Sequence, residues 1–261
     1  MNLSSLELSI VIPAYNEERR LGRALEHIRD YFSAQPAGMT SIEILIIDDG
    51  SADGTARLAQ EWARENPSVR LIANGRNRGK GYSVRHGMLE ARGRVALFTD
   101  ADLSAPIEES AKLLKAIEAG SDVAIGSRAL DRSLISVRQS GLREAAGKIF
   151  NGSVWLFTGL PFHDTQCGFK AFVRDRCRII FEQQLIERFA FDPEVLFLAQ
   201  RHGLRVTEVP VRWAHDPATK VHMLRDSLRM FCDLFYIRWN WLVGRYPIRH
   251  PTPETREIPT R

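Results

Sequence analysis

The sequence predicts an α/β fold in which helices pack on both faces of a central, mostly parallel β-sheet. Through the first half of the chain, short continuous apolar runs alternate with segments whose apolar residues recur at helical spacing. Polar residues follow directly after several of the apolar runs. The composition, with 44% apolar and 26% charged residues among 261, is that of a folded globular protein. Continuous rather than alternating apolar runs favour a sheet that is buried on both sides.

The first two strands are expected at residues 8–13, LSIVIP, and 42–48, IEILIID, because each is a short apolar run rich in β-branched residues. A helix is expected between them, since apolar residues there recur at spacings of four, three and four and therefore share one face. These residues are Leu21, Leu25, Ile28 and Phe32.

Three further strands are expected at 69–73, 94–100 and 122–128. The helix that precedes the first of them begins with DGTARLAQ, where Asp53 is placed to cap its first turn. Another helix, YSVRHGMLEA, connects the strands at 69–73 and 94–100. Helical crossovers of this kind join parallel strands, which is why we expect a mostly parallel sheet.

The helix after residue 100 is expected to start at Ser104, whose side chain can cap it, with Pro106 in the first turn. Proline is tolerated there because the first turn of a helix has no partner for its N–H groups. The apolar face of this helix should consist of Ile107, Ala111, Leu114 and Ile117.

The second half of the chain is less regular. A helix is expected at 191–203, capped by Asp192 ahead of Pro193. A strand is expected at 206–213, and its Pro210 favours a position at the edge of the sheet because proline cannot donate to a second neighbour.

Composition and charge exclude several classes of protein. The three cysteines form no CxxC pair, so neither a disulfide framework nor a zinc site is predicted, and a reducing cytosol fits best. The N-terminal segment lacks a basic region and Pro13 stops its apolar run, so we expect no signal peptide or membrane anchor. Basic residues outnumber acidic ones by nine to three over 57–94 and by eight to four over 201–245. Such clusters favour an anionic partner, although a solvated basic face is the alternative.

Polar side chains stand where four of the predicted strands end. The carboxyl ends of parallel strands meet at one edge of an open sheet, and such sheets bind their ligands outside that edge. We therefore expect these four segments to converge on one site. They are 15–17 (Tyr-Asn-Glu), 48–50 (Asp-Asp-Gly), 100–102 (Asp-Ala-Asp) and 127–128 (Ser-Arg).

Asp100 and Asp102 lie two residues apart, so in extended chain their carboxylates would point to the same side. Two like charges at the end of a buried strand are costly unless something offsets them. A divalent cation would do so, and oxygen ligands suit Mg²⁺ or Mn²⁺, which often hold substrate phosphates as well. The predicted chemistry is metal-assisted departure of a nucleoside diphosphate. The alternative is that each aspartate only caps a turn or a helix.

Two polar segments allow further phosphate or base contacts. DDGSADGT fails the spacing of a calcium loop, and Asp53 and Gly54 account for a turn and a helix cap. This leaves Asp49 able to accept a hydrogen bond from a base N–H. The segment GRNRGKGYS at 75–83 departs from the spacing of a Walker loop, but a basic, glycine-rich loop can still contact a pyrophosphate.

Taken in order, VIPAYNEERRL, IIDDGSADGT, NRGKG, FTDADLS, GSR and DTQCGFKAF resemble the family 2 glycosyltransferases of the GT-A fold. The resemblance covers roughly residues 8 to 245. Within that family the sequence is most similar to the dolichyl-phosphate β-glucosyltransferases, with the dolichyl-phosphate mannosyltransferases next. NRGKG, DTQCGFK and FAFDPEVLFLAQ match the glucosyl branch better.

The resemblance implies a Rossmann-like GT-A fold and a metal-dependent, inverting transfer of glucose from UDP-glucose to a polyprenyl phosphate. It leaves open a mannosyltransferase that uses GDP-mannose, and a catalytically silent protein that binds nucleotide sugars at a membrane. Residues 1–215 would form the GT-A domain, residues 216–246 an acceptor loop and an amphipathic helix, and residues 247–261 a disordered tail.

Carried over by position, the resemblance also assigns roles to individual residues. The nucleoside would be held by Pro13, Tyr15, Glu17, Ile47 and Asp49. The metal would be held by Asp100 and Asp102, and the rest of the donor by Lys80, Asp100, Ala101 and Asp102. The acceptor phosphate would be held by Arg128, Arg143 and Lys220.

A catalytic base is not expected to be needed for a phosphate acceptor. The second pKa of a phosphate monoester is about 6, so the acceptor is mostly a dianion near neutral pH. Cations that bind it and offset repulsion from the diphosphate are needed instead, and the fork of an arginine suits that role. Asp164 stands where other members of the family keep a base, and we expect it to orient other groups here.

A lipid acceptor would also account for residues 228–243, LRMFCDLFYIRWNWLV, in which five aromatic residues are interleaved with charges. The charges make a membrane span unfavourable, whereas a helix lying in the membrane interface accommodates them. The alternative is an amphipathic helix packed on the domain core or at a dimer surface. We therefore expect a peripheral protein on the cytoplasmic face of a membrane; no motif supports nucleic-acid binding, and the oligomeric state is left open.

Overall fold

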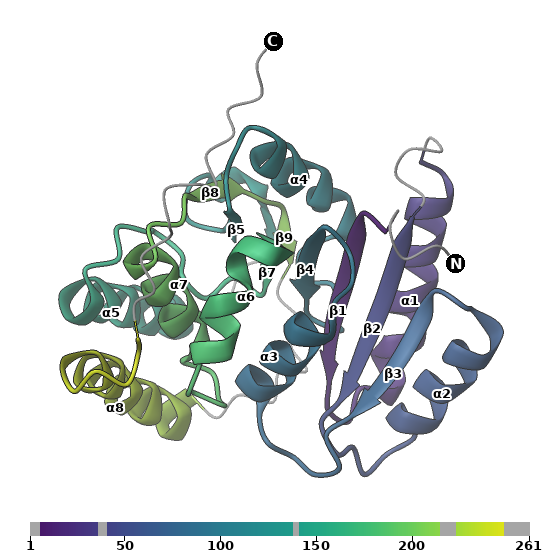
Figure 1. The fold of residues 1–261 in the computed structure, drawn as a ribbon, viewed down its shortest axis with the longest axis horizontal. Helices are drawn as coiled ribbons and strands as arrows, with labels where there is room; N and C mark the ends of the chain where they lie inside the picture. Colours follow the sequence, from purple (N-terminus) through teal and green to yellow (C-terminus); the bar gives the residue numbers. More distant parts are fainter. Residues whose placement is uncertain (1–5, 36–40, 138–140, 215–222, 248–261) are drawn as a thin grey trace.

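The computed structural model describes residues 6–35, 41–137, 141–214 and 223–247. The described part of the chain contains a seven-stranded sheet with the order β3-β2-β1-β4-β7-β5-β8 (Figure 1). Every strand is parallel to its neighbours except β7, which runs antiparallel to both β4 and β5. The predicted α/β fold with a mostly parallel sheet is therefore confirmed.

The strands expected in the first half of the chain form with small shifts at their ends. β1 pairs with β2 from Leu8 and Ile42 to Ala14 and Asp48, so the two strands finish level with each other. The bounds of the strands in this sheet are β1 Leu8–Ala14, β2 Ile42–Asp48, β3 Val69–Ala73, β4 Val95–Thr99, β5 Val123–Ser127, β7 Phe169–Val173 and β8 Val206–Pro210.

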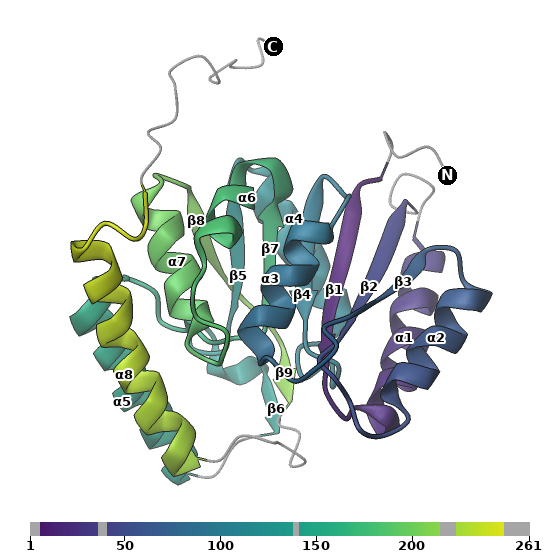
Figure 2. The same ribbon diagram turned by 60° about the horizontal axis from the view of Figure 1, so that its bottom comes forward.

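Helices cover both faces of the sheet, as Figure 2 shows. The reason is visible in β1, where Ile10 and Ile12 join the apolar cluster on one face and Val11 joins the cluster on the other. One face is covered by α1 Glu18–Ser33, α2 Thr55–Glu65 and α4 Ser110–Glu118. The other carries α3 Lys80–Glu90, α5 Gly141–Thr158, α6 Arg174–Gln183, α7 Phe191–Arg201 and α8 Met223–Leu242.

Helix starts confirm one predicted cap and correct two. Asp53 accepts a hydrogen bond from the N–H of Thr55 at 3.0 Å, at the start of α2, as expected. Ser104 caps no helix: a short 3₁₀ turn at Ile107–Glu109 precedes α4, and the N–H of Ser104 donates to Asp102 instead. Asp192 lies inside the first turn of α7, which begins at Phe191.

The apolar face expected for the helix after residue 100 is also partly wrong. Ile107 and Ile117 are buried, as expected, but Ala111 is exposed and Leu114 is only half-buried. Leu113 is fully buried in their place. The 3₁₀ turn causes this change, since it winds three rather than 3.6 residues per turn and rotates the following helix.

The strand expected at 206–213 ends at Pro210 and pairs only with β5 in the large sheet, so its predicted edge position is confirmed. Beyond it, Trp213–Ala214 forms β9, which pairs with β6, Ile135–Val137, in a separate two-stranded sheet. β7 and the helices α5 and α6 are elements that the sequence patterns did not predict. β7 inserts between β4 and β5, and its partners are remote in sequence.

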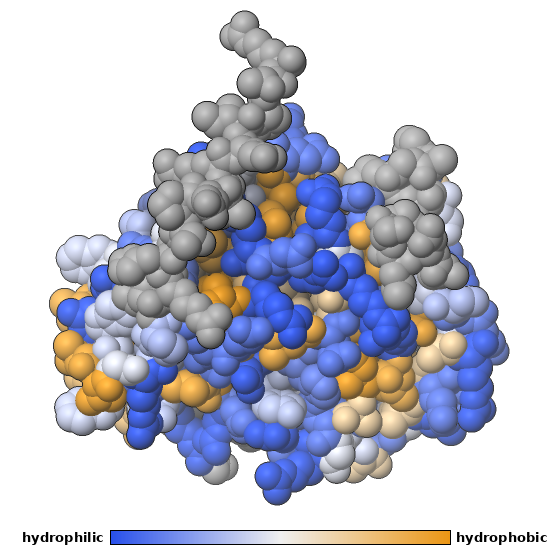
Figure 3. All heavy atoms as spheres, in the orientation of Figure 1, coloured by the Kyte–Doolittle hydropathy of each residue, from blue (hydrophilic) through white to orange (hydrophobic). Residues whose placement is uncertain are grey.

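α5 and α8 lie side by side on the outer side of α7 (Figure 2). Aromatic rings join them, with Phe150 against Phe231 at 5.8 Å between centroids and Phe157 against Phe235 at 4.3 Å. Apolar side chains gather along the left margin of Figure 3, over these helices. We call the exposed set the α5–α8 apolar surface: Ile149, Trp155, Leu156, Leu228, Phe235, Tyr236, Trp239, Leu242 and Val243. Within the described residues, no helix has the length and apolarity required to span a bilayer.

Candidate active site

The carboxyl ends of β1, β2 and β4 lie next to one another at one edge of the sheet. The loops after β1 and β2 are joined by hydrogen bonds: the N–H of Asn16 donates to Ser51 Oγ at 2.9 Å, and Asn16 Oδ1 accepts from Ala52 at 2.8 Å. Asn16 adopts a φ of 54°, a left-handed conformation that asparagine tolerates. The order of strands reverses between β1 and β4, which is where sheets of this type place their ligands.

Asp49 organises the neighbouring glycine-rich loop. Its carboxylate accepts hydrogen bonds from the side chain of Asn74 at 2.8 Å and from the N–H groups of Arg78 at 2.9 Å and Gly79 at 2.8 Å. Arg78 and Gly79 belong to the segment 75–83 that the sequence singled out as a phosphate-contacting loop, and Asn74 directly precedes it. The predicted contact of Asp49 with a base N–H stays a prediction, and the structure adds this second role.

Lys80 follows that loop and reaches the carboxyl end of β4, where its Nζ lies 2.5 Å from Asp100 Oδ1. Burial would lower the pKa of Lys80, but attraction to Asp100 and Asp192 and the hydrogen bond to Asp100 raise it above its ordinary value. Lys80 is therefore a fixed cation beside the predicted metal site. The segments NRGKG and FTDADLS, which are separate in the sequence, therefore meet at this ion pair.

Asp100 and Asp102 come together through a turn, and the expectation of extended chain is wrong. The N–H of Leu103 donates to the carbonyl of Asp100 at 3.1 Å, and Leu103 has a φ of 48°. Burial, followed by repulsion from Asp100, raises the pKa of Asp102 above its ordinary value. A β-carbon on Gly168 would collide with Asp100 Oδ2, so glycine at that position lets the chain before β7 close on the aspartate.

The two aspartates fit a divalent cation that also binds substrate phosphates. No group of three or more histidine, cysteine, aspartate or glutamate side chains with metal-binding geometry occurs within the ranges that the structure describes. A site for Mg²⁺ normally takes one or two carboxylates from the protein and completes its shell with water and phosphate oxygens. Burial and then repulsion from Asp100 raise the pKa of Asp102, and a bound cation would favour its ionised form.

Arg128 and Asp164 form a bidentate ion pair at the end of β5. Arg128 Nε lies 2.6 Å from Asp164 Oδ2, and Arg128 Nη2 lies 2.8 Å from Asp164 Oδ1. Burial would raise the pKa of Asp164, but attraction and hydrogen bonds from Arg128 lower it below its ordinary value. A carboxylate held in this way is a poor proton acceptor, which agrees with the expected orienting role. Glu208 on β8 in turn accepts the N–H groups of His163 at 3.0 Å and Asp164 at 2.8 Å.

A second, buried ion pair joins Lys170 of β7 to Asp192 of α7. Lys170 also donates to the carbonyl of Cys167 at 2.7 Å. Sequence reasoning missed this pair and Glu208. The signal that could have found the ion pair is a lysine inside an apolar strand, in GFKAFV, because a lysine there needs a buried acid. The FDPE segment supplies that acid.

The remaining predicted residues occupy the same edge or lie outside what the structure describes. Pro13 and Ile47 are register partners in β1 and β2, and Tyr15 is partly exposed just beyond β1. The other placements are these: Glu17 pairs with Arg20 at 2.6 Å, Ala101 is buried, Arg143 belongs to α5 with a side chain outside the described set, and Lys220 lies outside the described residues.

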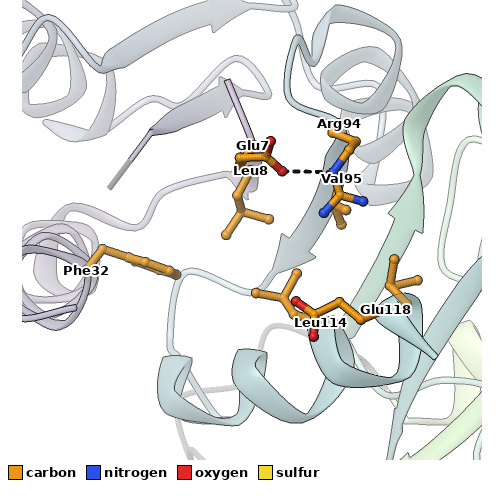
Figure 4. Close-up of a pocket in the computed structure, with 8 residues that line it drawn as sticks. Glu7, Leu8, Phe32, Arg94, Val95, Leu114 and Glu118 are labelled. Carbon is orange, nitrogen blue, oxygen red and sulfur yellow. Dashed lines mark hydrogen bonds and ion pairs between the residues drawn. The ribbon is translucent and has the colours of Figure 1, made fainter. Parts of the chain in front are cut away.

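A pocket of about 90 Å³ opens at the opposite edge of the sheet, at the starts of β1 and β4 (Figure 4). Phe32 and Leu114 line it, and an ion pair between Glu7 and Arg94 at 2.8 Å borders it. Pockets for small-molecule ligands usually measure about 300–1,000 Å³, so this one is too small for a nucleotide sugar. The Asp100–Asp102 pair, Lys80 and the Arg128–Asp164 ion pair lie at the other edge.

Comparison with known proteins identifies the family. The family model described as glycosyl transferase family 2 matches residues 9–178, a range that ends inside α6 and includes the Asp100–Asp102 pair and Asp164. The chain belongs to glycosyltransferase family 2. This glycosyltransferase is therefore an enzyme that transfers a sugar, and the edge formed by β1, β2 and β4 is its candidate active site.

The glycosyltransferase is similar to curated proteins over almost its whole length. It is 39% identical to a dolichyl-phosphate β-glucosyltransferase of Drosophila melanogaster, over 94% of this chain and 78% of that protein. The protein of the same name from Saccharomyces cerevisiae is 36% identical over 92% and 76% of the two chains. The human protein of that name is 34% identical over 92% and 77%.

Solved glycosyltransferase structures share the fold. Glucosyl-3-phosphoglycerate synthase of Mycobacterium tuberculosis in complex with UDP superposes with a TM-score of 0.62 at 18% identity, over 95% of this chain and 83% of that one. The same enzyme has also been solved with Mn²⁺, UDP and glucosyl-3-phosphoglycerate. A mannosyltransferase from Pyrobaculum calidifontis with GDP-mannose and Mn²⁺ gives a TM-score of 0.55 at 15% identity, over 92% and 70%. The GT-A fold expected from the sequence is thereby confirmed.

Proposed function

We propose that this glycosyltransferase moves glucose from UDP-glucose to a polyprenyl phosphate with inversion at the anomeric carbon. The observation that carries the proposal is the pairing of Asp164 with Arg128, which engages the carboxylate at the family's base position and fixes a cation there. A phosphate acceptor needs the cation and no base, whereas a sugar hydroxyl would need the base. The similarity to proteins named dolichyl-phosphate β-glucosyltransferase supports the same acceptor class.

In the proposed reaction, one oxygen of the acceptor phosphate bonds to the anomeric carbon from the face opposite UDP. The bond between that carbon and the β-phosphate oxygen breaks at the same time, and its electron pair leaves with UDP. Arg128 would bind the incoming phosphate, with Arg143 and Lys220 as further ligands. Lys80 would contact the donor diphosphate from its position beside Asp100.

Asp100 and Asp102 would hold a Mg²⁺ or Mn²⁺ ion, which when bound neutralises charge on the departing diphosphate. The nucleoside would lie across the ends of β1 and β2, against Pro13, Tyr15 and Ile47. Glu17 and Asp49 would complete this part of the site, with Asp49 acting through both the base and the loop that it holds. Ala101, small and buried between the two aspartates, would lie next to the donor.

We further propose that the α5–α8 apolar surface lies in a membrane interface and presents the lipid acceptor. It extends the predicted interfacial segment 228–243 by Trp155 and two aliphatic residues of α5. Isolated apolar residues on a surface are ordinary, but a cluster of this kind on two adjacent helices marks an interaction site. Because the proposed donor is a nucleotide sugar, we place the enzyme on the cytoplasmic face of that membrane.

A panel of nucleotide sugars with a short polyprenyl phosphate tests the proposal. We expect UDP release and a glucosyl-phospholipid with UDP-glucose and Mn²⁺ or Mg²⁺, and loss of both in Asp102→Ala. Product from GDP-mannose alone would establish the mannosyl alternative. Nucleotide binding without product from any donor would establish a catalytically silent protein and overturn the proposal.

A further inference from the structure

Glu194 of α7 is a fully buried carboxylate that no step of the proposed reaction uses. It accepts hydrogen bonds from the N–H groups of Leu185 and Ile186, each at 2.9 Å, and from the hydroxyl of Tyr246 at 2.6 Å. Tyr246 comes from the chain just after α8. Desolvation of a buried carboxylate is costly unless hydrogen bonds offset it. Here they come from the backbone of the loop at 185–186 and from Tyr246, which follows α8.

The loop that Glu194 holds is itself the support of the glycine-rich loop. A β-carbon on Gly79 would lie 2.5 Å from the carbonyl oxygen of Glu187, and one on Gly81 would lie 2.6 Å from that of Ile186. The N–H of Tyr82 donates to Glu187 O at 3.0 Å. These close backbone contacts leave residues 79–82, at the start of α3, little freedom to move relative to residues 186–187.

Two more bonds tie the same segments together. The side chain of Gln184 donates to the carbonyls of Gly81 and Ile186, both at 2.9 Å. Arg78 pairs with Glu187 and stacks on Tyr82, with its guanidinium carbon 3.6 Å from the ring centroid. Lys80 sits between these fixed points, and its Nζ reaches Asp100. A continuous set of contacts therefore runs from the end of α8 to the predicted donor site.

We propose that Glu194 and Tyr246 are positioning residues that place Lys80 at the donor site and make its placement depend on the seating of α8. The donor part of this proposal rests on the proposed function, whereas the contact chain does not. Because α8 carries most of the α5–α8 apolar surface, the same contacts would couple the seating of that surface to the donor site. Burial raises the pKa of Glu194 to about 7, and the hydrogen bonds from Tyr246, Ile186 and Leu185 act against this rise.

Amide hydrogen exchange on the intact chain tests the contact chain without any substrate. In Glu194→Gln and Tyr246→Phe we expect faster exchange at Leu185 and Ile186 and also at the N–H groups of 82–83. Tyr246→Phe removes one hydroxyl and keeps both backbone bonds, so it remains informative should Glu194→Gln fold poorly. Faster exchange confined to residues 185–186 would overturn the proposal.

A matched control is available at the other edge of the sheet. Glu43 is also buried, and its carboxylate accepts the N–H of Arg92 at 2.6 Å and the hydroxyl of Ser9 at 2.6 Å. Glu43→Gln should lower stability but leave exchange at 82–83 and nucleotide affinity unchanged. Tyr31→Phe on α1, which packs on the opposite face of the sheet, is the control for Tyr246→Phe.

Kinetics with UDP-glucose separate positioning from general destabilisation. Loss of one charged or buried hydrogen bond should raise KM for the donor about five- to tenfold in Glu194→Gln and Tyr246→Phe, with a smaller change in kcat. The double variant should resemble the more severe single variant, because the two residues act on one element. A KM equal to that of Glu43→Gln would contradict the proposal. Absence of activity with UDP-glucose in the unmutated protein would refute the proposed function, and the exchange result would still stand.

Discussion

Individual side chains explain why the site carries so many charges without losing its structure. Asp164 is matched by Arg128, Lys80 by Asp100, and buried Lys170 by Asp192. Each pair joins residues from different elements, so the charges hold the loops together as well as serving chemistry. Asp102 differs from these, because repulsion from Asp100 follows burial as a cause of its raised pKa. This imbalance is what a divalent cation would correct.

Replacing Asp164 by Asn tests its role. Asparagine keeps the shape but weakens the bidentate bond to Arg128, so we expect turnover to fall by about ten- to a hundredfold while the protein stays folded. Steady-state rates and circular dichroism would measure this. Total loss of turnover in a folded protein would mean that Asp164 is a base after all. Asp175→Asn, on the exposed side of α6, is the matched control.

Gly168→Ala tests the contact behind the metal site. The added methyl would displace the carboxylate of Asp100, so we expect the concentration of Mn²⁺ needed for half-maximal activity to rise about tenfold. Metal titration of activity measures the change. In Gly22→Ala, on α1, the new methyl meets its nearest atom at 3.7 Å, and metal dependence should not change. An unchanged metal requirement in Gly168→Ala would show that Asp100 is not a ligand.

The pKa of Glu194 predicts how stability depends on pH. Burial raises this pKa from its ordinary 4.5 to about 7, so the folded protein keeps a proton that the unfolded chain releases. The stabilisation is complete below about pH 4.5 and is lost as pH rises through 7. Tyr246 and Asp233, both from the α8 region, are the neighbouring titratable groups.

Urea unfolding between pH 5 and 7.5 should therefore show the free energy of unfolding of the unmutated protein falling relative to that of Glu194→Gln. Glutamine does not titrate, so the two profiles should diverge over this window. Parallel profiles would show that the carboxylate is already ionised at pH 5.

At the scale of elements, the site depends on how loops are attached to rigid strands and helices. The loops after β1 and β2 are joined to each other, and the glycine-rich loop before α3 is held by Asp49 on one side and by residues 184–188 on the other. α8 serves two purposes. Its buried Leu234 and Ile237 belong to the core, while Trp239 and Leu242 form part of the α5–α8 apolar surface.

Point substitutions on this surface test the membrane proposal better than removal of the C-terminus, which would also strip Leu234 and Ile237 from the core. We expect Trp155→Glu combined with Trp239→Glu to reduce co-flotation with anionic phosphatidylglycerol vesicles by at least about tenfold, because each exposed tryptophan that enters the membrane interface should contribute about 1 kcal/mol or more. Gln60→Glu, at an exposed position of α2 away from this surface, is the control for added negative charge. Undiminished flotation of the double variant would contradict the membrane proposal and indicate that the α5–α8 apolar surface binds another partner.

Across the whole molecule, the two edges of the sheet differ in purpose. The edge at the carboxyl ends holds the Lys80–Asp100 and Arg128–Asp164 ion pairs and the paired aspartates. The opposite edge holds a small pocket and the structural carboxylate Glu43. Ligand binding at the first edge should therefore stabilise the fold as a unit, because the strands that meet there belong to one sheet.

UDP with Mn²⁺ should raise the thermal midpoint by several degrees. At a hundred times the dissociation constant, a ligand adds about 2.7 kcal/mol to the free energy of unfolding. Differential scanning fluorimetry measures the shift, which should disappear with a chelator and in Asp102→Asn. A full shift of the thermal midpoint without metal, or in Asp102→Asn, would show that UDP binds away from the aspartate pair.

The strands β1 to β5, the existence of the helices between them and the polar residues at their ends are predictable from the sequence alone, because apolar periodicity and turn chemistry are local properties of the chain. The sequence also shows that Asp100 and Asp102 place two like charges close together at the end of a buried strand. Three features became visible only in the folded chain: the antiparallel insertion of β7, the use of Asp49 to hold the glycine-rich loop, and the partners of Lys170 and Glu194. Each of these is a contact between residues far apart in sequence, and local spacing carries no record of which distant group will satisfy a buried charge or a strand edge.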